Sequence, residues 1–247
     1  MKIGFIGLGN MGGSLARVVA GQKKHQILLA NRSSEKAKQI AHEVGGEPVT
    51  NEVVFEQANV IFLGVKPTQF ADLLQEYHAI LEKRSSVLFI SMAAGLTLQQ
   101  LEAFVPTQHR LIRIMPNTPV TVGDGVISYV LSDKATEQDE DLLCELLDSA
   151  GLLVHLKEQQ DAATAVAGCG PAFVYLFLEA LADAGVQTGL PRDLALQLAN
   201  QTLLGAAALA KESGQHPAVL KDQVCSPAGS TIAGVASLEA DAFRGNI

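Results

Sequence analysis

Residues 2–12 read Lys2-Ile-Gly-Phe-Ile-Gly-Leu-Gly-Asn-Met-Gly12, and the class of fold follows from them. Residues 2–6 form a short apolar run that predicts a buried strand. The glycines that follow are spaced Gly-x-Gly-x-x-Gly ahead of a helix predicted over residues 11–20. In this context Gly7 permits a tight turn, Gly9 lets the backbone approach a pyrophosphate, and Gly12 allows the helix to pack closely on the strand. The stretch therefore predicts a dinucleotide-binding turn; the alternative is a glycine-rich turn that binds no ligand.

Strand and helix patterns alternate along the first part of the chain. Predicted strands cover residues 26–30, 59–65, 86–91, 111–115, 126–131 and 152–156, and predicted helices cover residues 34–44, 67–81 and 137–148. This alternation predicts an α/β fold with a doubly wound, Rossmann-type parallel sheet. Beyond residue 161 only helical patterns follow, over residues 161–166, 172–184, 192–212 and 217–224. We therefore expect a dinucleotide-binding domain over residues 1–158 and an all-helical dimerisation and substrate-binding domain over residues 159–247.

The helix predicted over residues 192–212 is apolar on more than one face, which a small helical lobe cannot cover by itself. A second copy of the same lobe is the expected cover, which predicts a homodimer. A helix buried within a monomer is the alternative.

Composition excludes several classes of function. A net charge of −8 leaves no basic surface for nucleic acid or an anionic membrane. The cysteines form no CxxC pair and the histidines lack metal-ligand spacing, so we expect no metal site and a reducing compartment. The chain enters a strand directly after Met1-Lys2, which leaves no room for a signal peptide. Its longest uncharged run, residues 162–178, contains Gly168, Gly170 and Pro171, so we expect no membrane span and a cytoplasmic protein.

The end of the second predicted strand bears on the choice of cofactor. It reads Asn31-Arg32-Ser33-Ser34, where an NAD-selective site commonly carries an acidic residue for the ribose hydroxyls. Arg32 with neutral neighbours suits a 2′-phosphate instead, which favours NADP(H) over NAD(H), although NAD(H) stays possible. An ordinary solvated arginine is the alternative.

The segment Asp222-Gln-Val-Cys-Ser-Pro-Ala-Gly-Ser-Thr-Ile232 carries the best sign of chemistry in the helical part. Pro227, small residues and two hydroxyls precede an apolar stretch. This pattern predicts a helix start that presents free backbone N–H groups and hydroxyls to a small anion.

Ordered motifs over nearly the whole chain are similar to those of the pyrroline-5-carboxylate reductase family. They are residues 3–9, Val65-Lys-Pro67, Ser91-Met-Ala-Ala-Gly95, Met115-Pro-Asn-Thr-Pro119, Gly168-Cys-Gly-Pro-Ala172, residues 179–184, 205–207 and 220–222, and Ser226-Pro-Ala-Gly-Ser-Thr-Ile232. The resemblance implies NAD(P)H-dependent reduction of the cyclic imine 1-pyrroline-5-carboxylate to L-proline, the last step of proline biosynthesis. It also implies a homodimer, with dimers sometimes assembled further.

The resemblance also implies site residues. Contacts with the cofactor fall by position on Ile6, Gly7, Leu8, Gly9, Asn10, Met11, Asn31, Arg32, Asn51, Gly64, Val65, Lys66, Pro67, Met92, Ala93 and Ala94. Contacts with the substrate fall on Ser226, Gly229, Ser230 and Thr231. The Thr231 hydroxyl, the one catalytic group expected, faces the imine nitrogen and reaches a cofactor held mainly by the partner subunit.

One departure and two alternatives accompany this resemblance. Ala228 stands where the family usually has glycine, and alanine disfavours a positive φ there.

The β-hydroxyacid dehydrogenases resemble the N-terminal half, but they place a catalytic lysine in the first long helix of the second domain. Here no lysine occurs between Lys157 and Lys211, which argues against a dehydrogenase of this class. A reductase of another cyclic imine and a catalytically silent, NADP-binding redox sensor remain as alternatives.

Overall fold

The structure is a computed structural model that describes residues 1–157 and 159–246. The chain divides into two compact units, Met1–Ala172 and Phe173–Ile247, and each is described by itself. The predicted domain boundary, 158/159, falls at Glu158, which lies outside the described residues. The contact-based division comes later because residues after 159 still pack on the sheet of the first unit.

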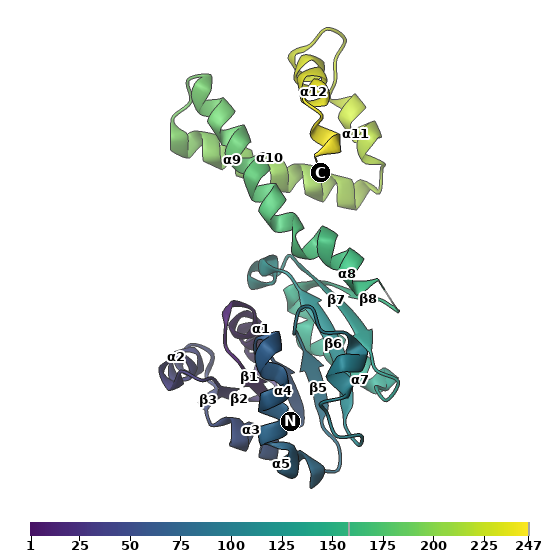
Figure 1. Cartoon of the computed structure of the whole chain (residues 1–247). Helices are drawn as coiled ribbons and strands as arrows, with labels where there is room; N and C mark the ends of the chain where they lie inside the picture. The colour runs from purple at the N-terminus through teal and green to yellow at the C-terminus, as the bar shows by residue number, and fades with distance from the viewer. Residues whose placement is uncertain (158, 247) are drawn as a thin grey trace. The chain divides into compact units, whose positions relative to one another are not determined.

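An eight-stranded sheet forms the centre of the first unit, in the order β3-β2-β1-β4-β5-β6-β7-β8 (Figure 1). Its strands are β1 (Lys2–Ile6), β2 (Gln26–Ala30), β3 (Glu47–Pro48), β4 (Val60–Leu63), β5 (Leu88–Ser91), β6 (Arg110–Pro116), β7 (Gly125–Leu131) and β8 (Gly151–His155). Every neighbouring pair is parallel except β6 and β7. The strand order reverses between β1 and β4, which is the switch point where α/β proteins bind ligands beyond the carboxyl ends of the strands. The predicted doubly wound sheet is confirmed.

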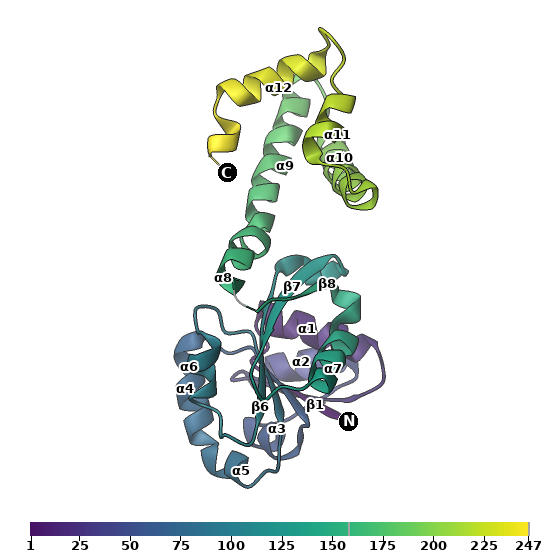
Figure 2. The same cartoon turned by 90° about the vertical axis from the view of Figure 1, so that its right-hand side faces the viewer.

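Helices cover both faces of this sheet (Figure 2). One face carries α1 (Asn10–Gly21), α2 (Ser34–Val44) and α7 (Glu137–Leu147); the other carries α3 (Asn51–Gln57), α4 (Pro67–Glu76), α5 (His78–Glu82) and α6 (Leu98–Glu102). Alternate strand residues feed the two cores, because Ile3 and Phe5 of β1 pack in one cluster and Ile6 packs in the other. Short 3₁₀ turns, η1 (Thr118–Val122) and η2 (Asp148–Ala150), follow β6 and precede β8.

A long run of helix leads from the first unit into the second. It comprises α8 (Gln160–Ala163), the π-helical turn η3 (Thr164–Gly168) and α9 (Gly170–Gln187). The glycines and proline at 168–171 were expected to interrupt the helix, and this expectation was wrong. Gly168 ends the π turn, and Pro171 lies in the first turn of α9, where a helix tolerates proline. The Asn117 side-chain amide donates to the Ala167 carbonyl over 2.9 Å. The helix Gln160–Gln187 is consequently long and apolar enough to cross a membrane, judged by length and composition only.

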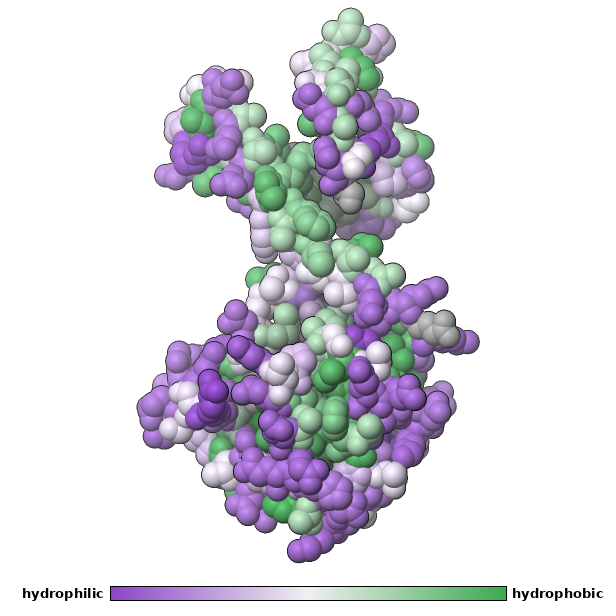
Figure 3. Space-filling view, viewed as in Figure 1, coloured by the Kyte–Doolittle hydropathy of each residue, from purple (hydrophilic) through white to green (hydrophobic). Residues whose placement is uncertain are grey.

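The second unit is helical in all its described elements. These are the rest of α9, then α10 (Arg192–Ser213), α11 (Pro217–Gln223), α12 (Ser230–Ala240) and a last turn, η4 (Phe243–Gly245). Its buried core is small and consists of Ala182, Ala195 and Ala199 with neighbouring leucines and a valine. Large apolar side chains on α9 remain exposed, among them Phe173, Tyr175 and Leu176. Figure 3 shows hydrophobic residues gathered on the surface of this helix.

Candidate functional site

The glycine-rich turn after β1 is closely packed on one side and open on the other. Gly7 has φ +90°, and a Cβ there would lie 2.6 Å from the Gly64 carbonyl carbon. A Cβ on Gly12 would lie only 2.1 Å from the Gly7 carbonyl oxygen. A Cβ on Gly9 would meet no heavy atom within 4 Å. Gly7, Gly12 and Gly64 are therefore required by packing, whereas Gly9 leaves open space at the mouth of the turn.

That open space lies against the start of α1. Gly9 is the N-cap residue of α1 and offers no side-chain hydrogen bond to the first turn. The first N–H groups of a helix have no partner within the helix, so they are free to bind an anion. A closely packed turn, an open glycine and an uncapped helix of this length fit the pyrophosphate of a dinucleotide.

Asn31 ties this turn to the end of β2. The Leu8 backbone N–H donates to Asn31 Oδ1 over 2.9 Å, and the Asn31 side-chain amide donates to the Ser33 carbonyl over 3.2 Å. The side chain of Asn31 is thus engaged within the protein and orders the loop. The adjacent Arg32 is exposed, and no ion pair of the described residues includes it.

The remaining residues expected at the cofactor come from neighbouring strand ends. The Gly64 N–H donates to the Ile6 carbonyl over 2.8 Å, and the Met92 N–H donates to the Leu63 carbonyl over 3.2 Å. Lys66 is exposed at the N-cap of α4, and Asn51 is the first residue of α3.

These strand ends meet at one edge of the sheet, which brings most of the expected cofactor residues together. Ile6, Leu8 and Ala93 are buried in the core, so their side chains are not free to meet a ligand.

The loop before α12 forms a compact turn in the second unit. Ala228 has φ +55°, and the Gly229 N–H donates to the Ser226 carbonyl over 3.0 Å. Ala228 therefore adopts the left-handed conformation that glycine adopts readily and that alanine disfavours. Because the Gly229 N–H is already engaged, it is not available to a substrate.

Free donors follow directly after this turn. Gly229 is the N-cap of α12 and, lacking a side chain, leaves the N–H groups of Ser230, Thr231 and Ile232 without a capping partner. Thr231 itself is exposed. The start of α12 thus presents amides and a hydroxyl together, as the sequence predicts.

Lys221 and Asp222 form an ion pair on the segment that precedes this loop. Lys221 Nζ lies 2.5 Å from Asp222 Oδ1, and this hydrogen bond raises the pKa of Lys221. In the part of the chain that the structure describes, no group of three histidine, cysteine, aspartate or glutamate side chains could hold a metal ion.

Comparison with known proteins covers both halves of the chain. Residues 157–247 match the family described as pyrroline-5-carboxylate reductase dimerisation, and residues 2–95 match the family described as NADP oxidoreductase, coenzyme F420-dependent. Pyrroline-5-carboxylate reductase of Pisum sativum is 42% identical, over 99% of this chain and 90% of the pea protein. The chain belongs to the pyrroline-5-carboxylate reductase family.

Other members of the family agree in sequence and in structure. Pyrroline-5-carboxylate reductase 2 of Homo sapiens is 40% identical, over 99% of this chain and 78% of the human protein. The crystal structure of Plasmodium falciparum pyrroline carboxylate reductase with NADP bound has a TM-score of 0.88 and 34% identity, and covers 100% of this chain and 92% of that one. Imine reductase of Bacillus cereus, at 16% identity and a TM-score of 0.52, shares the fold alone.

Proposed function

We propose that the chain reduces 1-pyrroline-5-carboxylate to L-proline with NADPH as the reductant. The proposal rests above all on the match to pyrroline-5-carboxylate reductases, because 40–42% identity to the pea and human proteins extends over 99% of the chain and thus includes both units. The open glycine turn supports it on the cofactor side, and the start of α12 supports it on the substrate side.

On the substrate side, the chain supplies donors rather than a strong acid. The free N–H groups of Ser230, Thr231 and Ile232 suit a carboxylate, since a helix N-terminus carries partial positive charge. The Thr231 hydroxyl is then suited to donate a hydrogen bond to the imine nitrogen, which stabilises the electron density arriving there. In the reduction, the imine carbon gains a hydride and the nitrogen gains a proton that comes from water by way of the Thr231 hydroxyl, so that the C=N bond becomes a single bond.

On the cofactor side, the chain binds and orients. When bound, NADPH supplies the hydride. The amides at the start of α1 hold the pyrophosphate, and Gly9 leaves the space for it. Arg32, exposed at the end of β2, favours a cofactor that carries a 2′-phosphate, so we propose that NADPH is preferred over NADH.

A homodimer accounts for the exposed apolar surface of the second unit. Phe173, Leu176 and Phe177 of α9 line a cavity of about 540 Å³ together with Leu238 and Phe243. Burying such surface against a second copy is favourable by roughly 25 cal/mol per Å². The dimerisation family matches residues 157–247, which also supports a functional division at 158/159.

The same surface bears on the length and apolar composition of the helix Gln160–Gln187. We propose that its apolar residues are covered by the partner rather than by lipid, because Glu179 and Asp183 interrupt the apolar sequence of α9. We accordingly propose a cytoplasmic dimer, with further assembly of dimers. Light scattering coupled to size exclusion, without detergent, tests whether the partner covers this apolar surface. A monomer, or aggregation that detergent relieves, would contradict the proposed dimer.

The activity is tested by following NADPH absorbance with the purified protein. We expect oxidation of NADPH with 1-pyrroline-5-carboxylate, and much slower oxidation with six-membered cyclic imines. A preference for a six-membered imine would favour the alternative of another imine reductase. Binding of NADPH without turnover of any cyclic imine would favour the redox sensor, and NADP⁺-dependent oxidation of a 2-hydroxy acid would favour a dehydrogenase.

A further inference from the structure

Two sequence motifs that have no role in the candidate site meet in the first unit. One covers residues 115–119 at the end of β6, and the other covers residues 168–172 at the start of α9. Directly before the second motif, the Ala167 carbonyl accepts the hydrogen bond from the Asn117 side-chain amide, over 2.9 Å. Asn117 is 7% exposed, so this bond is shielded from water.

The Ala167 carbonyl needs a donor from outside its own helix. In an α-helix it would accept from the N–H four residues further on, but that residue is Pro171, which has no N–H. Asn117 supplies the missing donor. The Cys169 N–H meanwhile donates five residues back, to the Thr164 carbonyl over 3.1 Å, which is the wider spacing of a π turn. Pro171 and Asn117 together therefore account for the shape of this turn.

Asn117 is itself held firmly by the neighbouring strand. Its Oδ1 accepts from the Val126 N–H over 2.8 Å, and its backbone N–H donates to the Val126 carbonyl over 3.1 Å. The helix before the π turn is held to the same strands, because the Gln160 side-chain amide donates to the Arg113 and Ser128 carbonyls over 3.3 Å each. The turn is thus fixed to the sheet rather than free to shift.

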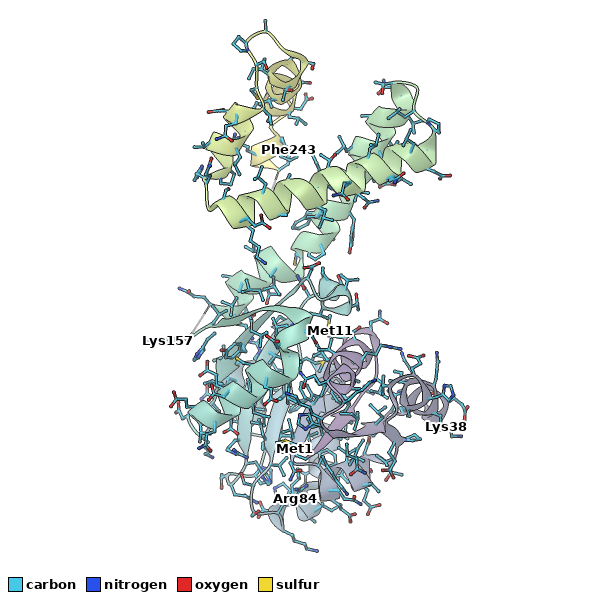
Figure 4. The ribbon with its side chains drawn as sticks, turned by 180° about the vertical axis from the view of Figure 1, so that it is seen from behind. Met1, Met11, Lys38, Arg84, Lys157 and Phe243 are labelled. Atoms are coloured by element: carbon cyan, nitrogen blue, oxygen red, sulfur yellow. The ribbon has the colours of Figure 1, made fainter. Side chains whose placement is uncertain are left out.

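The π turn stands beyond the end of β5. Ser91, the last residue of β5, pairs with Arg113, and the expected cofactor residues 92–94 follow it. β6 continues past this pair, and Asn117 lies four residues further on, about 13 Å at the spacing of a strand. The segment that carries the turn follows Lys157, which Figure 4 shows at one side of the first unit. In a Rossmann fold a cofactor with its adenosine at β2 has its nicotinamide across the switch point, beyond β4 and β5, so the turn borders the nicotinamide half of the site.

We infer that Asn117 is a positioning residue for the reduction of the imine. It holds the π turn at the edge of the sheet where the cyclic imine meets the nicotinamide, and so sets the distance and angle over which the hydride is transferred. Asn117 acts through the Ala167 carbonyl and is not itself placed against the substrate. This inference rests on the proposed function, because it assumes that the chain reduces a cyclic imine. A shift of about 1 Å in the placement of reacting groups can cost about 100-fold in rate.

A bond that only stabilised the fold would behave differently. Its loss would lower the free energy of unfolding and leave kcat of the folded enzyme unchanged. A bond that shaped the cofactor site would raise the Kd for NADPH when lost. A positioning role lowers kcat while the Kd for NADPH stays the same.

The test is a double-mutant cycle of Asn117→Asp and Pro171→Ala in the full chain. Asn117→Asp keeps an oxygen that accepts from the Val126 N–H but replaces the donor to Ala167 with a carboxylate oxygen. Pro171→Ala restores an N–H four residues beyond Ala167, which can donate to that carbonyl in place of Asn117. Steady-state kinetics with 1-pyrroline-5-carboxylate, nicotinamide fluorescence for the Kd of NADPH, and urea denaturation are measured for all four proteins. Asn117→Ser, which is neutral, takes the place of Asn117→Asp if the carboxylate prevents folding.

We expect Asn117→Asp to lower kcat about 10- to 100-fold and to leave the Kd for NADPH within about twofold. In the Pro171→Ala background the same change should lower kcat by no more than about threefold, because the Ala167 carbonyl no longer depends on Asn117. The two substitutions should be coupled in the free energy of unfolding for the same reason.

Three results would overturn the inference. They are an unchanged kcat in folded Asn117→Asp, an equal loss of kcat with and without Pro171→Ala, and a Kd for NADPH that rises as much as kcat falls. All three presuppose a wild type that reduces the imine, so they leave the proposed function intact. A wild type that reduces no imine contradicts the proposed function, and this inference with it.

Discussion

Replacing Gly9 and Gly12 in turn separates cofactor binding from folding. Gly9 has φ −63°, an ordinary value for any residue, and an added Cβ meets nothing within 4 Å. Gly12 would place its Cβ 2.1 Å from the Gly7 carbonyl oxygen, a backbone atom that cannot rotate away. We expect Gly9→Ala to fold normally and bind NADPH poorly, and Gly12→Ala to be destabilised.

The expected change in stability follows from these distances. At Gly9, alanine destabilises the folded state because it is a poorer N-cap residue than glycine. Alanine also restricts the unfolded chain, which favours folding; each of these opposing effects is about 0.5–1 kcal/mol. The free energy of unfolding of Gly9→Ala should therefore stay within about 1 kcal/mol of the wild type. At Gly12 the overlap forces the backbone to move, which costs about 1–3 kcal/mol or more.

The expected change in binding comes from the same open space. A methyl group on Gly9 fills the approach of the pyrophosphate to the amides at the start of α1. Loss of one hydrogen bond to a charged group is worth about 1.5–3 kcal/mol, which corresponds to about a 10- to 100-fold rise in Kd. Because the pyrophosphate is common to both cofactors, NADPH and NADH should weaken together.

Urea denaturation followed by circular dichroism measures stability, and nicotinamide fluorescence measures binding. A folded Gly9→Ala variant that binds NADPH as tightly as the wild type would refute the placement of the pyrophosphate. A Gly12→Ala variant as stable as the wild type would refute the packing argument.

Three further predictions concern the second unit and pH. Thr231→Ala should lower kcat about 100-fold while the Kd for NADPH stays unchanged, and Thr231→Ser should recover most of the rate. Steady-state kinetics measure both effects. An unchanged kcat in Thr231→Ala would show that the hydroxyl takes no part in the mechanism. Ala228 has φ +55°, so Ala228→Gly should lose neither stability nor rate. Ala228→Val should lower the free energy of unfolding, measured by urea denaturation, by about 1 kcal/mol or more, because β-branched residues rarely adopt this conformation. Equal stability of the wild type and both variants would contradict strain in this turn. The pKa of His109 is lowered from 6.5 mainly by burial, and its Nδ1 accepts from the Val87 N–H over 3.1 Å. Since the unfolded state binds the proton more readily, the free energy of unfolding should fall as pH falls below 6.5. His109→Gln should make the free energy of unfolding less dependent on pH in this range. The same pH dependence in the wild type and in His109→Gln would contradict this role of His109.

Much of the first unit could be predicted because its local signals agree with its packing. The strand Lys2–Ile6 and the helix Ser34–Val44 appear with the predicted bounds. The helix Asn51–Gln57 was missed because it is short; its one signal was Thr50, whose side chain accepts from the Val53 N–H. The helix predicted over residues 67–81 breaks at Tyr77, whose ring stacks on Phe55, a tertiary contact that hydropathy does not reveal.

The candidate site, like the fold, could be predicted only in part. The spacing of Gly7, Gly9 and Gly12 could be interpreted from the sequence because Gly7 and Gly12 are required by the packing of the turn and Gly9 leaves open space at its mouth. In the helical unit, the resemblance rather than the pattern of residues pointed to Thr231. The hydrogen bond from the Gly229 N–H to the Ser226 carbonyl depends on the folded shape of the turn, which the sequence pattern does not specify.

The proposed reaction is the transfer of a hydride from NADPH to a cyclic imine, with formation of L-proline. Its most direct test is to incubate the purified protein with 1-pyrroline-5-carboxylate and NADPH that carries deuterium at the transferred position of the nicotinamide, and to analyse the product by chiral chromatography and mass spectrometry. We expect L-proline with one deuterium at the former imine carbon. Absence of proline, or proline without deuterium, would contradict the claim.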